Sequence, residues 1–197
     1  MKRRLMHPAA GLSIVEVLFA LAIGVTVTGI AIPLTADAVR EVRAAAAGRY
    51  LASRIVSVRM DAVRRSKAVA LRFIPSGSDY QYAVFEDGNG NGVRTTDIAA
   101  GIDTQVTPYE RLGDKFPGIR FALPAGIPDA DGAASASEDG VRIGTPRILT
   151  MTPDGSCTGG TLYLTGRGGT YAVRTLGATG RTRVLYFDEG EGAWINQ

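Results

Sequence analysis

The longest apolar run in the chain covers residues 12–34, where Glu16 is the single ionisable residue. At a rise of ~1.5 Å per residue, a helix of this length crosses a hydrocarbon core of ~30 Å. The pattern therefore predicts a membrane-spanning helix. A carboxylate inside such a helix is costly to bury, so Glu16 is a candidate functional residue that needs a partner.

Residues 35–67 keep a helical period but become amphipathic. Apolar residues recur there at spacings of three and four, which predicts that they share one buried helix face. We expect one continuous helix from Leu12 to about Ser66, with its second half packed against a folded head. Arginines fill the remaining faces, either as a solvated surface or, alternatively, as a surface for an anionic ligand. The predicted buried positions are Val39, Val42, Ala46, Leu51, Ile55, Val58 and Ala62.

After Lys67 the period changes to that of β-strands. Residues 68–73 and the alternating Tyr80, Tyr82 and Val84 predict a hairpin around a turn at 75–78. The Ala-, Gly- and Asp-rich segment 124–146 is predicted to be a loop. A long helix followed by about seven short antiparallel strands gives an α+β fold, with the helix covering one sheet face. The later predicted strands are 119–123, 148–152, 161–164, 171–176 and 183–187, and Trp194 and Ile195 close the series.

Composition argues against catalysis. The chain has one histidine, His7, and one cysteine, Cys157. If the basic leader 1–11 is removed, His7 leaves with it, and the remaining chain cannot build a Ser-His-Asp or Cys-His nucleophile system or a zinc site of the usual ligands. We therefore expect a protein that is not an enzyme. Cys157 has no second cysteine for an internal disulfide, and we expect it to be buried, with an intermolecular bond as the alternative.

The start of the chain carries a recognisable processing signal. A short basic leader ends in Gly11, and Glu16 is the fifth residue after that glycine. This resembles the class III signal of type IV pilins and type II secretion pseudopilins. The resemblance implies that a prepilin peptidase cuts between Gly11 and Leu12 and methylates the new amine. It also implies that Glu16 pairs with the amine of a neighbouring subunit and that Pro33 is the helix-kinking proline. Leu12 departs from the usual phenylalanine at the first position.

Features after the N-terminal signal indicate one particular family of pilin-like proteins. The stem, the β-rich remainder and the late Gly-Arg-x-Arg sequence at 180–183 are similar to the GspH/FimT family of minor pseudopilins and minor pilins. Membership would imply a pilin-like subunit, non-enzymatic, of a type II secretion system or a type IV pilus. It would have a cleaved leader 1–11, a transmembrane helix 12–34, an amphipathic stem 35–67 and a periplasmic head 68–197. It would cross the inner membrane once, with its N-terminus cytoplasmic before cleavage.

An ordinary secretory signal is the rival interpretation of the same stretch. Ala36-Asp37-Ala38 is a small-x-small sequence, and cleavage after Ala38 would release a soluble protein. The apolar run is long for that purpose, because such signals have an apolar region of only ~7–15 residues.

Two further groups of residues in the head are candidate binding sites. Asp87, Asn89 and Asn91 precede Gly92 with the spacing that opens an EF-hand calcium loop, and Asp97 follows. The closing position is Ile98, where a bidentate glutamate is required. The alternative is a turn-rich hairpin loop without metal, because Asn-Gly pairs tolerate positive φ.

The second group is Arg181 and Arg183, which a strand would place on one face, where two guanidinium groups could bind adjacent phosphates. In FimT-type minor pilins such a sequence is associated with DNA capture. The alternative is a glycine turn that opens a strand with two solvated arginines.

Overall fold

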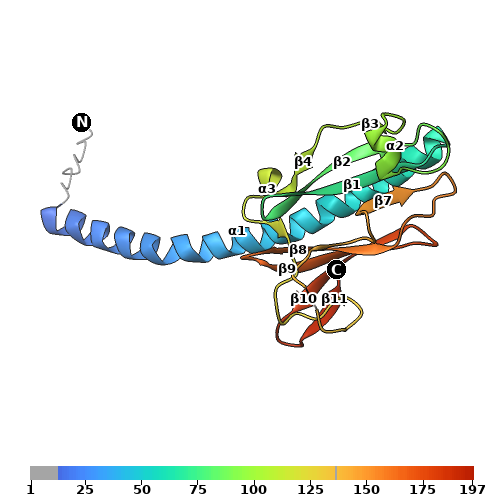
Figure 1. Cartoon of the computed structure of the whole chain (residues 1–197). Helices are drawn as coiled ribbons and strands as arrows, with labels where there is room; N and C mark the ends of the chain where they lie inside the picture. The colour runs from blue at the N-terminus through green and yellow to red at the C-terminus, as the bar shows by residue number, and fades with distance from the viewer. Residues whose placement is uncertain (1–12, 136) are drawn as a thin grey trace, which may run out of the picture. The chain divides into compact units, whose positions relative to one another are not determined.

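The computed structural model describes residues 13–135 and 137–197, and the side chains of residues 29–38 are outside that description (Figure 1). The chain divides into two compact units, Met1–Val39 and Arg40–Gln197. Helix α1 (Ile14–Arg65) contributes to both units, and two antiparallel sheets belong to the second. The α+β class predicted from the sequence is confirmed.

Residues at both ends of helix α1 stabilise its termini. The Val15 N–H donates to Ser13 Oγ at 3.3 Å, so Ser13 caps the first turn. At the other end, Arg64 and Arg65 complement the negative end of the helix dipole, and Ser66 adopts a left-handed backbone with φ 53°. The predicted end at about Ser66 is therefore confirmed.

The first sheet is built around the predicted hairpin. Strands β1 (Val69–Ser76) and β2 (Asp79–Glu86) pair in register, with Leu71 opposite Val84. Three shorter strands complete it: β7 (Ile148–Met151) pairs with β1, while β3 (Thr104–Gln105) and β4 (Glu110–Arg111) pair with β2. Short helices α2 (Thr95–Ala99) and α3 (Leu112–Lys115) lie in the connections.

The second sheet has the order β11-β10-β9-β8-β5, and β6 pairs with β8. Its long strands are β8 (Gly160–Gly166), β9 (Gly169–Leu176) and β10 (Arg181–Asp188). Its short strands are β5 (Arg120–Phe121), β6 (Val141–Arg142) and β11 (Ala193–Asn196). The segment 124–146, predicted to be a loop throughout, therefore contains β6, and the strand predicted at 119–123 is only two residues long.

The second half of α1 lies between the two sheets rather than on a single sheet face, as Figure 1 shows. Its buried side chains belong to one hydrophobic core that also includes Leu71 of β1 and Val173 of β9. Because both sheets place an apolar face against the helix, the expectation of one covered sheet was wrong. The buried helix positions are Ala44, Ala47, Leu51, Ile55, Val58 and Ala62.

The first three positions of the predicted buried face were also wrong. Val39 and Val42 are exposed, and Ala46 is half-buried. Val42 and Leu51 are nine residues apart, which is two and a half turns at 3.6 residues per turn, so their side chains leave opposite sides of the helix. The buried face runs back from Leu51 through Ala47 to Ala44 instead.

Within the part of the chain that the structure describes, no helix is both long enough and apolar enough to span a membrane.

The predicted leader 1–11 and Leu12 lie outside the described residues, and so do the side chains of residues 29–34. The transmembrane segment 12–34 stays a prediction.

Candidate assembly and binding sites

Of the residues in the predicted processing signal, the structure describes Glu16. Gly11 and Leu12 lie outside the described residues, and so does the side chain of Pro33. Glu16 is exposed in the first turn of α1, and none of the described residues forms an ion pair with it. Its spacing from Ser13 is that of a capping box, in which a carboxylate stabilises the helix N-terminus. The Ser-x-x-Glu pattern would have predicted this start from the sequence.

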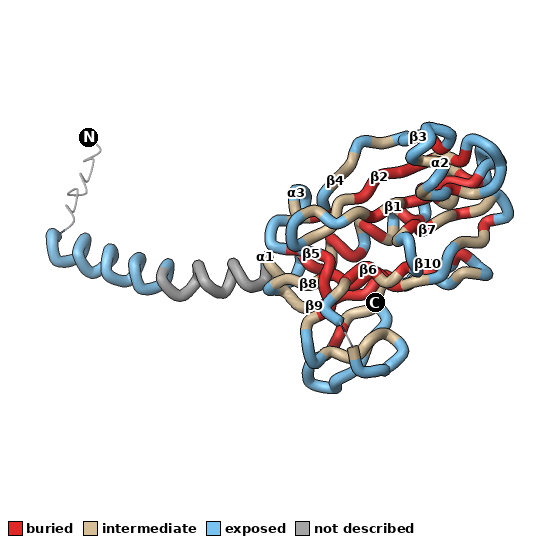
Figure 2. The backbone as a smooth tube through the Cα atoms, viewed as in Figure 1, coloured by how far each residue is buried: buried red, intermediate tan, exposed pale blue. Residues whose placement is uncertain are grey.

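The helix around Glu16 exposes apolar side chains on every side. Figure 2 shows the first described turns of α1 in the colour of exposed residues. Nine large apolar side chains between Ile14 and Val27 are 44–79% exposed. Thr26 and Thr28 satisfy their hydroxyl groups inside the helix, by donating to the carbonyl oxygens of Ala22 (2.8 Å) and Gly24 (2.6 Å). Such a surface needs lipid or another protein to cover it.

A shallow hollow of about 790 Å³ runs along one side of this segment, from Glu16 to Thr28. Its small residues, Ala20 and Gly24, let another helix approach closely, which is how helices associate in lipid. Glu16 is the single charged residue that lines it. A partner helix placed here would therefore meet a carboxylate at one end and apolar side chains beyond it.

In the second unit, α1 has an exposed apolar face that sequence reasoning missed. Val42, Val56, Met60 and Val63 are 44–69% exposed and lie on the side of the helix away from Leu51. The positions 42, 46, 49, 53, 56, 60 and 63 alternate spacings of four and three, as in the seam of a coiled coil. We call Val42, Val56, Met60 and Val63 the outer seam. The outer seam has the same alternating spacing of three and four as the buried face, and the sequence prediction assigned Val42 to the buried face.

The predicted arginine pair lies at the start of β10. Gly180 has φ 60°, and β10 begins at Arg181. Both Arg181 and Arg183 are exposed, whereas Val184 faces inward against Gly48 of α1. The predicted strand and the shared face are confirmed. No side chain in the described part of the chain forms a hydrogen bond or ion pair with either guanidinium group.

Strand register adds two more arginines to the same sheet face. Arg183 of β10 pairs with Arg174 of β9, Arg174 pairs with Thr161 of β8, and Thr161 pairs with Arg142 of β6. Directly opposed residues in an antiparallel sheet project from the same face. Arg142, Arg174 and Arg183 therefore form one row across the sheet, which no local sequence pattern could reveal.

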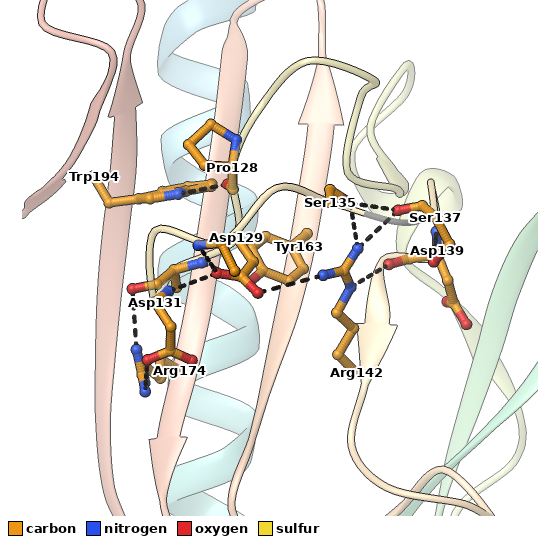
Figure 3. Close-up of polar contacts among 12 residues, drawn as sticks. Pro128, Asp129, Asp131, Ser135, Ser137, Asp139, Arg142, Tyr163, Arg174 and Trp194 are labelled. Atoms are coloured by element: carbon orange, nitrogen blue, oxygen red, sulfur yellow. Dashed lines mark hydrogen bonds and ion pairs between the residues drawn. The ribbon is translucent and has the colours of Figure 1, made fainter.

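The 124–140 segment crosses this face and binds two arginines of the row (Figure 3). Arg174 donates to Ala130 O at 3.1 Å and to Asp131 Oδ1 at 2.6 Å. Arg142 donates to Ser135 Oγ at 2.5 Å and to Ser137 O at 2.7 Å. Arg174 and Arg142 thus donate hydrogen bonds to Asp131 and to the serine oxygens, and these donors are not available to an external anion.

Aromatic residues fix the same segment on the sheet. The Tyr163 Oη accepts from the Ala130 N–H at 2.8 Å, and the Trp194 Nε1–H donates to Pro128 O at 3.0 Å (Figure 3). The guanidinium carbon of Arg142 is 5.3 Å from the centroid of the Tyr163 ring. This segment is therefore a tethered part of the head rather than a free loop.

Three of the predicted calcium ligands, Asp87, Asn89 and Asn91, lie in the loop after β2, and Asp97 lies in α2. Both carboxylates accept hydrogen bonds. Asp87 is buried and accepts from the backbone N–H groups of Asn89 (3.0 Å), Gly90 (2.8 Å) and Gly92 (2.7 Å). Burial alone would raise the pKa of Asp87, but these donors hold it below its usual value. Asp97 accepts from the side-chain amides of Asn89 (3.2 Å) and Asn91 (2.9 Å).

Among the described residues, no group of three or more His, Cys, Asp or Glu side chains is placed to hold a metal ion. The geometry of the Asp87 loop favours the hairpin-loop interpretation, since Asp87 organises the turn through backbone donors. Calcium binding stays a prediction, to be tested by calcium titration of the melting temperature.

Cys157 is half-buried rather than fully buried as expected. Its Sγ is 3.6 Å from Leu176 O, and burial raises the pKa of its thiol.

No protein-family model matches this chain, and no curated protein matches it. A solved structure that is similar to it is the minor pseudopilin EpsH from the type 2 secretion system of Vibrio cholerae. The TM-score is 0.47 and the identity is 14%, over 73% of this chain and 96% of that one. A likeness this weak leaves the assignment of function to the residues themselves.

Proposed function

We propose that this chain is a non-enzymatic minor pseudopilin or minor pilin subunit of a type II secretion system or a type IV pilus. Residues 12–34 anchor it in the inner membrane, with the N-terminus cytoplasmic before prepilin peptidase cuts after Gly11 and with the head in the periplasm. The observation that carries the proposal is the outer seam of α1, an apolar helix face left uncovered on the side opposite the core.

The outer seam is suited to the helix of another pilin-like subunit. Its spacing is that of a coiled-coil seam, and a second helix could pack its own side chains between Val56, Met60 and Val63. Arg49 and Ser53 interrupt the apolar positions. Polar residues at seam positions fix register and partner choice at some loss of stability, as a subunit with one place in an assembly requires.

Glu16 supplies the second part of the assembly mechanism. An unpaired carboxylate in hydrocarbon costs several kcal/mol, so a neighbour's cationic N-terminal amine would favour in-register insertion. The amine in question is that of Leu12 after cleavage, methylated by the peptidase.

Photocrosslinking in membranes tests this proposal. A photoreactive phenylalanine analogue in place of Met60 should form adducts with other pilin-like subunits when these are co-expressed. Adding Val56→Glu should abolish the adducts, because a charge would be buried between helices, and Glu16→Leu should weaken them while processing and insertion continue. Val106→Glu is the matched control, since Val106 is 43% exposed on the head. Equal adduct yields from the Val56→Glu chain and its parent would contradict assembly through the outer seam.

A DNA-binding minor pilin for DNA uptake is the second candidate function. It is supported by the exposed pair Arg181 and Arg183, whose guanidinium groups have no partner among the described residues. A third and remote candidate is a soluble protein secreted after cleavage near Ala38. In that case the outer seam would require a different partner, and the chain would keep no anchor.

A further inference from the structure

A basic cavity lies at the beginning of the second unit. It has a volume of about 320 Å³ and is lined by Arg40, Arg43 and Arg167, together with the turn 117–119 and Gly168. The seven residues that line it include no aspartate or glutamate. Guanidinium groups that line one hollow repel each other, and an anion bound among them relieves that repulsion.

The walls of this cavity are held in place. The Arg43 Nη1–H donates to Pro117 O at 3.2 Å, which ties α1 to the turn before β5. Gly168, at the tip of the β8–β9 hairpin, contacts the helix backbone so closely that an added Cβ would overlap Arg40 O and lie 2.6 Å from Glu41 Cα. The hairpin can therefore approach α1 only with glycine at this position, and that approach brings Arg167 to the cavity.

We propose that this cavity binds the phosphate group of an anionic lipid. Guanidinium groups bind phosphate oxygens through paired, charge-assisted hydrogen bonds, and Arg43 of α1 and Arg167 of the β8–β9 turn both line the hollow. Lipid is the source because Arg40 follows the end of the predicted membrane span by only six residues, a separation of at most about 20 Å. This assignment rests on the proposed membrane anchor.

Modification of arginines by phenylglyoxal tests the proposal with the full chain. The chain is placed in nanodiscs of phosphatidylcholine alone or of equal parts phosphatidylcholine and phosphatidylglycerol, and each modified arginine is quantified by peptide mass spectrometry. Because a hydrogen bond to a charged group is worth about a factor of ten, phosphatidylglycerol should slow modification of Arg43 and Arg167 about tenfold. Arg120, exposed on β5 and outside the cavity, is the internal control and should react equally in both.

Further arms identify the source of the phosphate. Inorganic phosphate, or a duplex oligonucleotide, is added to the phosphatidylcholine nanodiscs. Protection by either of these without protection by phosphatidylglycerol would overturn the lipid assignment. Equal protection of Arg120, or no protection of Arg43 and Arg167 by any probe, would overturn the site itself.

A pair of variants checks that protection depends on the cavity. Soluble short-chain phosphatidylglycerol should raise the melting temperature of the parent chain and of R111Q/R120Q, but not that of R43Q/R167Q. The control removes two exposed charges outside the cavity. A chain that fails to enter nanodiscs would contradict the anchor alone, and this soluble-lipid titration would still decide whether the cavity binds the headgroup. An equal rise for R43Q/R167Q would contradict the site.

Discussion

Arg183 of β10 lies directly opposite Arg174 of β9, so two cationic side chains share one position of the sheet. Arg174 is held by Asp131, whereas no described residue holds Arg183. Like charges opposite each other are destabilising, and the Asp131 carboxylate reduces that repulsion. The free charge on this face is therefore concentrated at Arg181 and Arg183.

If the head binds DNA, R181A/R183A should weaken binding and flatten its dependence on salt. Each phosphate neutralised contributes roughly −0.9 to the log–log slope of affinity against salt, so the slope should change by about two. Titration of the full chain in nanodiscs with duplex DNA at several salt concentrations measures it. The control R111A/R120A should leave the slope unchanged. Absence of salt-dependent binding by the parent chain at low ionic strength would end the DNA hypothesis.

Gly180→Ala should destabilise the head, because Gly180 packs closely against Arg59 and Gly155 and has no room for a side chain. Arg59 Nε donates to Gly155 O at 2.8 Å, and an added Cβ at Gly180 would overlap Gly155 O and lie 2.7 Å from Arg59 Nε. The left-handed backbone alone costs about 1–3 kcal/mol for alanine. Gly132→Ala is the matched control, because Gly132 has φ 83° and open space around it.

We expect the melting temperature of G180A to fall several degrees further than that of G132A, since 1 kcal/mol shifts it by about 2–4 °C in a domain of this size. Equal decreases in melting temperature would mean that backbone strain, and not the contact between Arg59, Gly155 and Gly180, is the reason that position 180 requires glycine.

Asp139 should control the loss of stability in acid. It accepts from Tyr80 Oη (2.8 Å), Val141 N–H (2.9 Å) and Arg147 Nη2 (2.7 Å). Burial would raise the pKa of Asp139, but these donors, Arg147 first, lower it overall. Its contribution is therefore complete above the unfolded-state pKa of about 4 and is lost as pH falls through the lower folded-state pKa.

Asp139→Asn should lower the free energy of unfolding at neutral pH by about 1–3 kcal/mol and make the acid limb shallower. Urea titrations across the acid range measure this, with Asp114→Asn, an exposed residue without a partner in the described chain, as the control. An acid limb unchanged in D139N would contradict the assignment.

Much of the architecture could be predicted from the sequence, because apolar spacing reports which side of an element is buried. The hairpin of β1 and β2 and the end of α1 followed directly from alternation and from the change of period at Lys67. Strands of two residues, such as β6, carry no period and appear only through pairing.

The candidate sites were less predictable, because they depend on register and on which helix face is covered. Val42 was assigned to the core since its spacing fits a helical stripe, but two stripes exist on α1 and only tertiary packing decides between them. Arg174 joins Arg183 across the β9–β10 hairpin, and Arg142 joins them through its pairing with Thr161 of β8. The cavity of Arg40, Arg43 and Arg167 likewise needs the β8–β9 hairpin to fold back on α1.

The intact mass of the chain after co-expression with a prepilin peptidase shows whether the chain is processed as a pilin-like subunit. If the chain is a pilin-like subunit, the product begins at Leu12 and carries one methyl group on its amine, and the uncleaved precursor persists when the peptidase is omitted. Gly11→Ala is expected to block the cut, with Gly24→Ala as a control because Gly24 has open space around it. A product that begins at Val39, with or without the peptidase, would contradict the account and favour ordinary secretion.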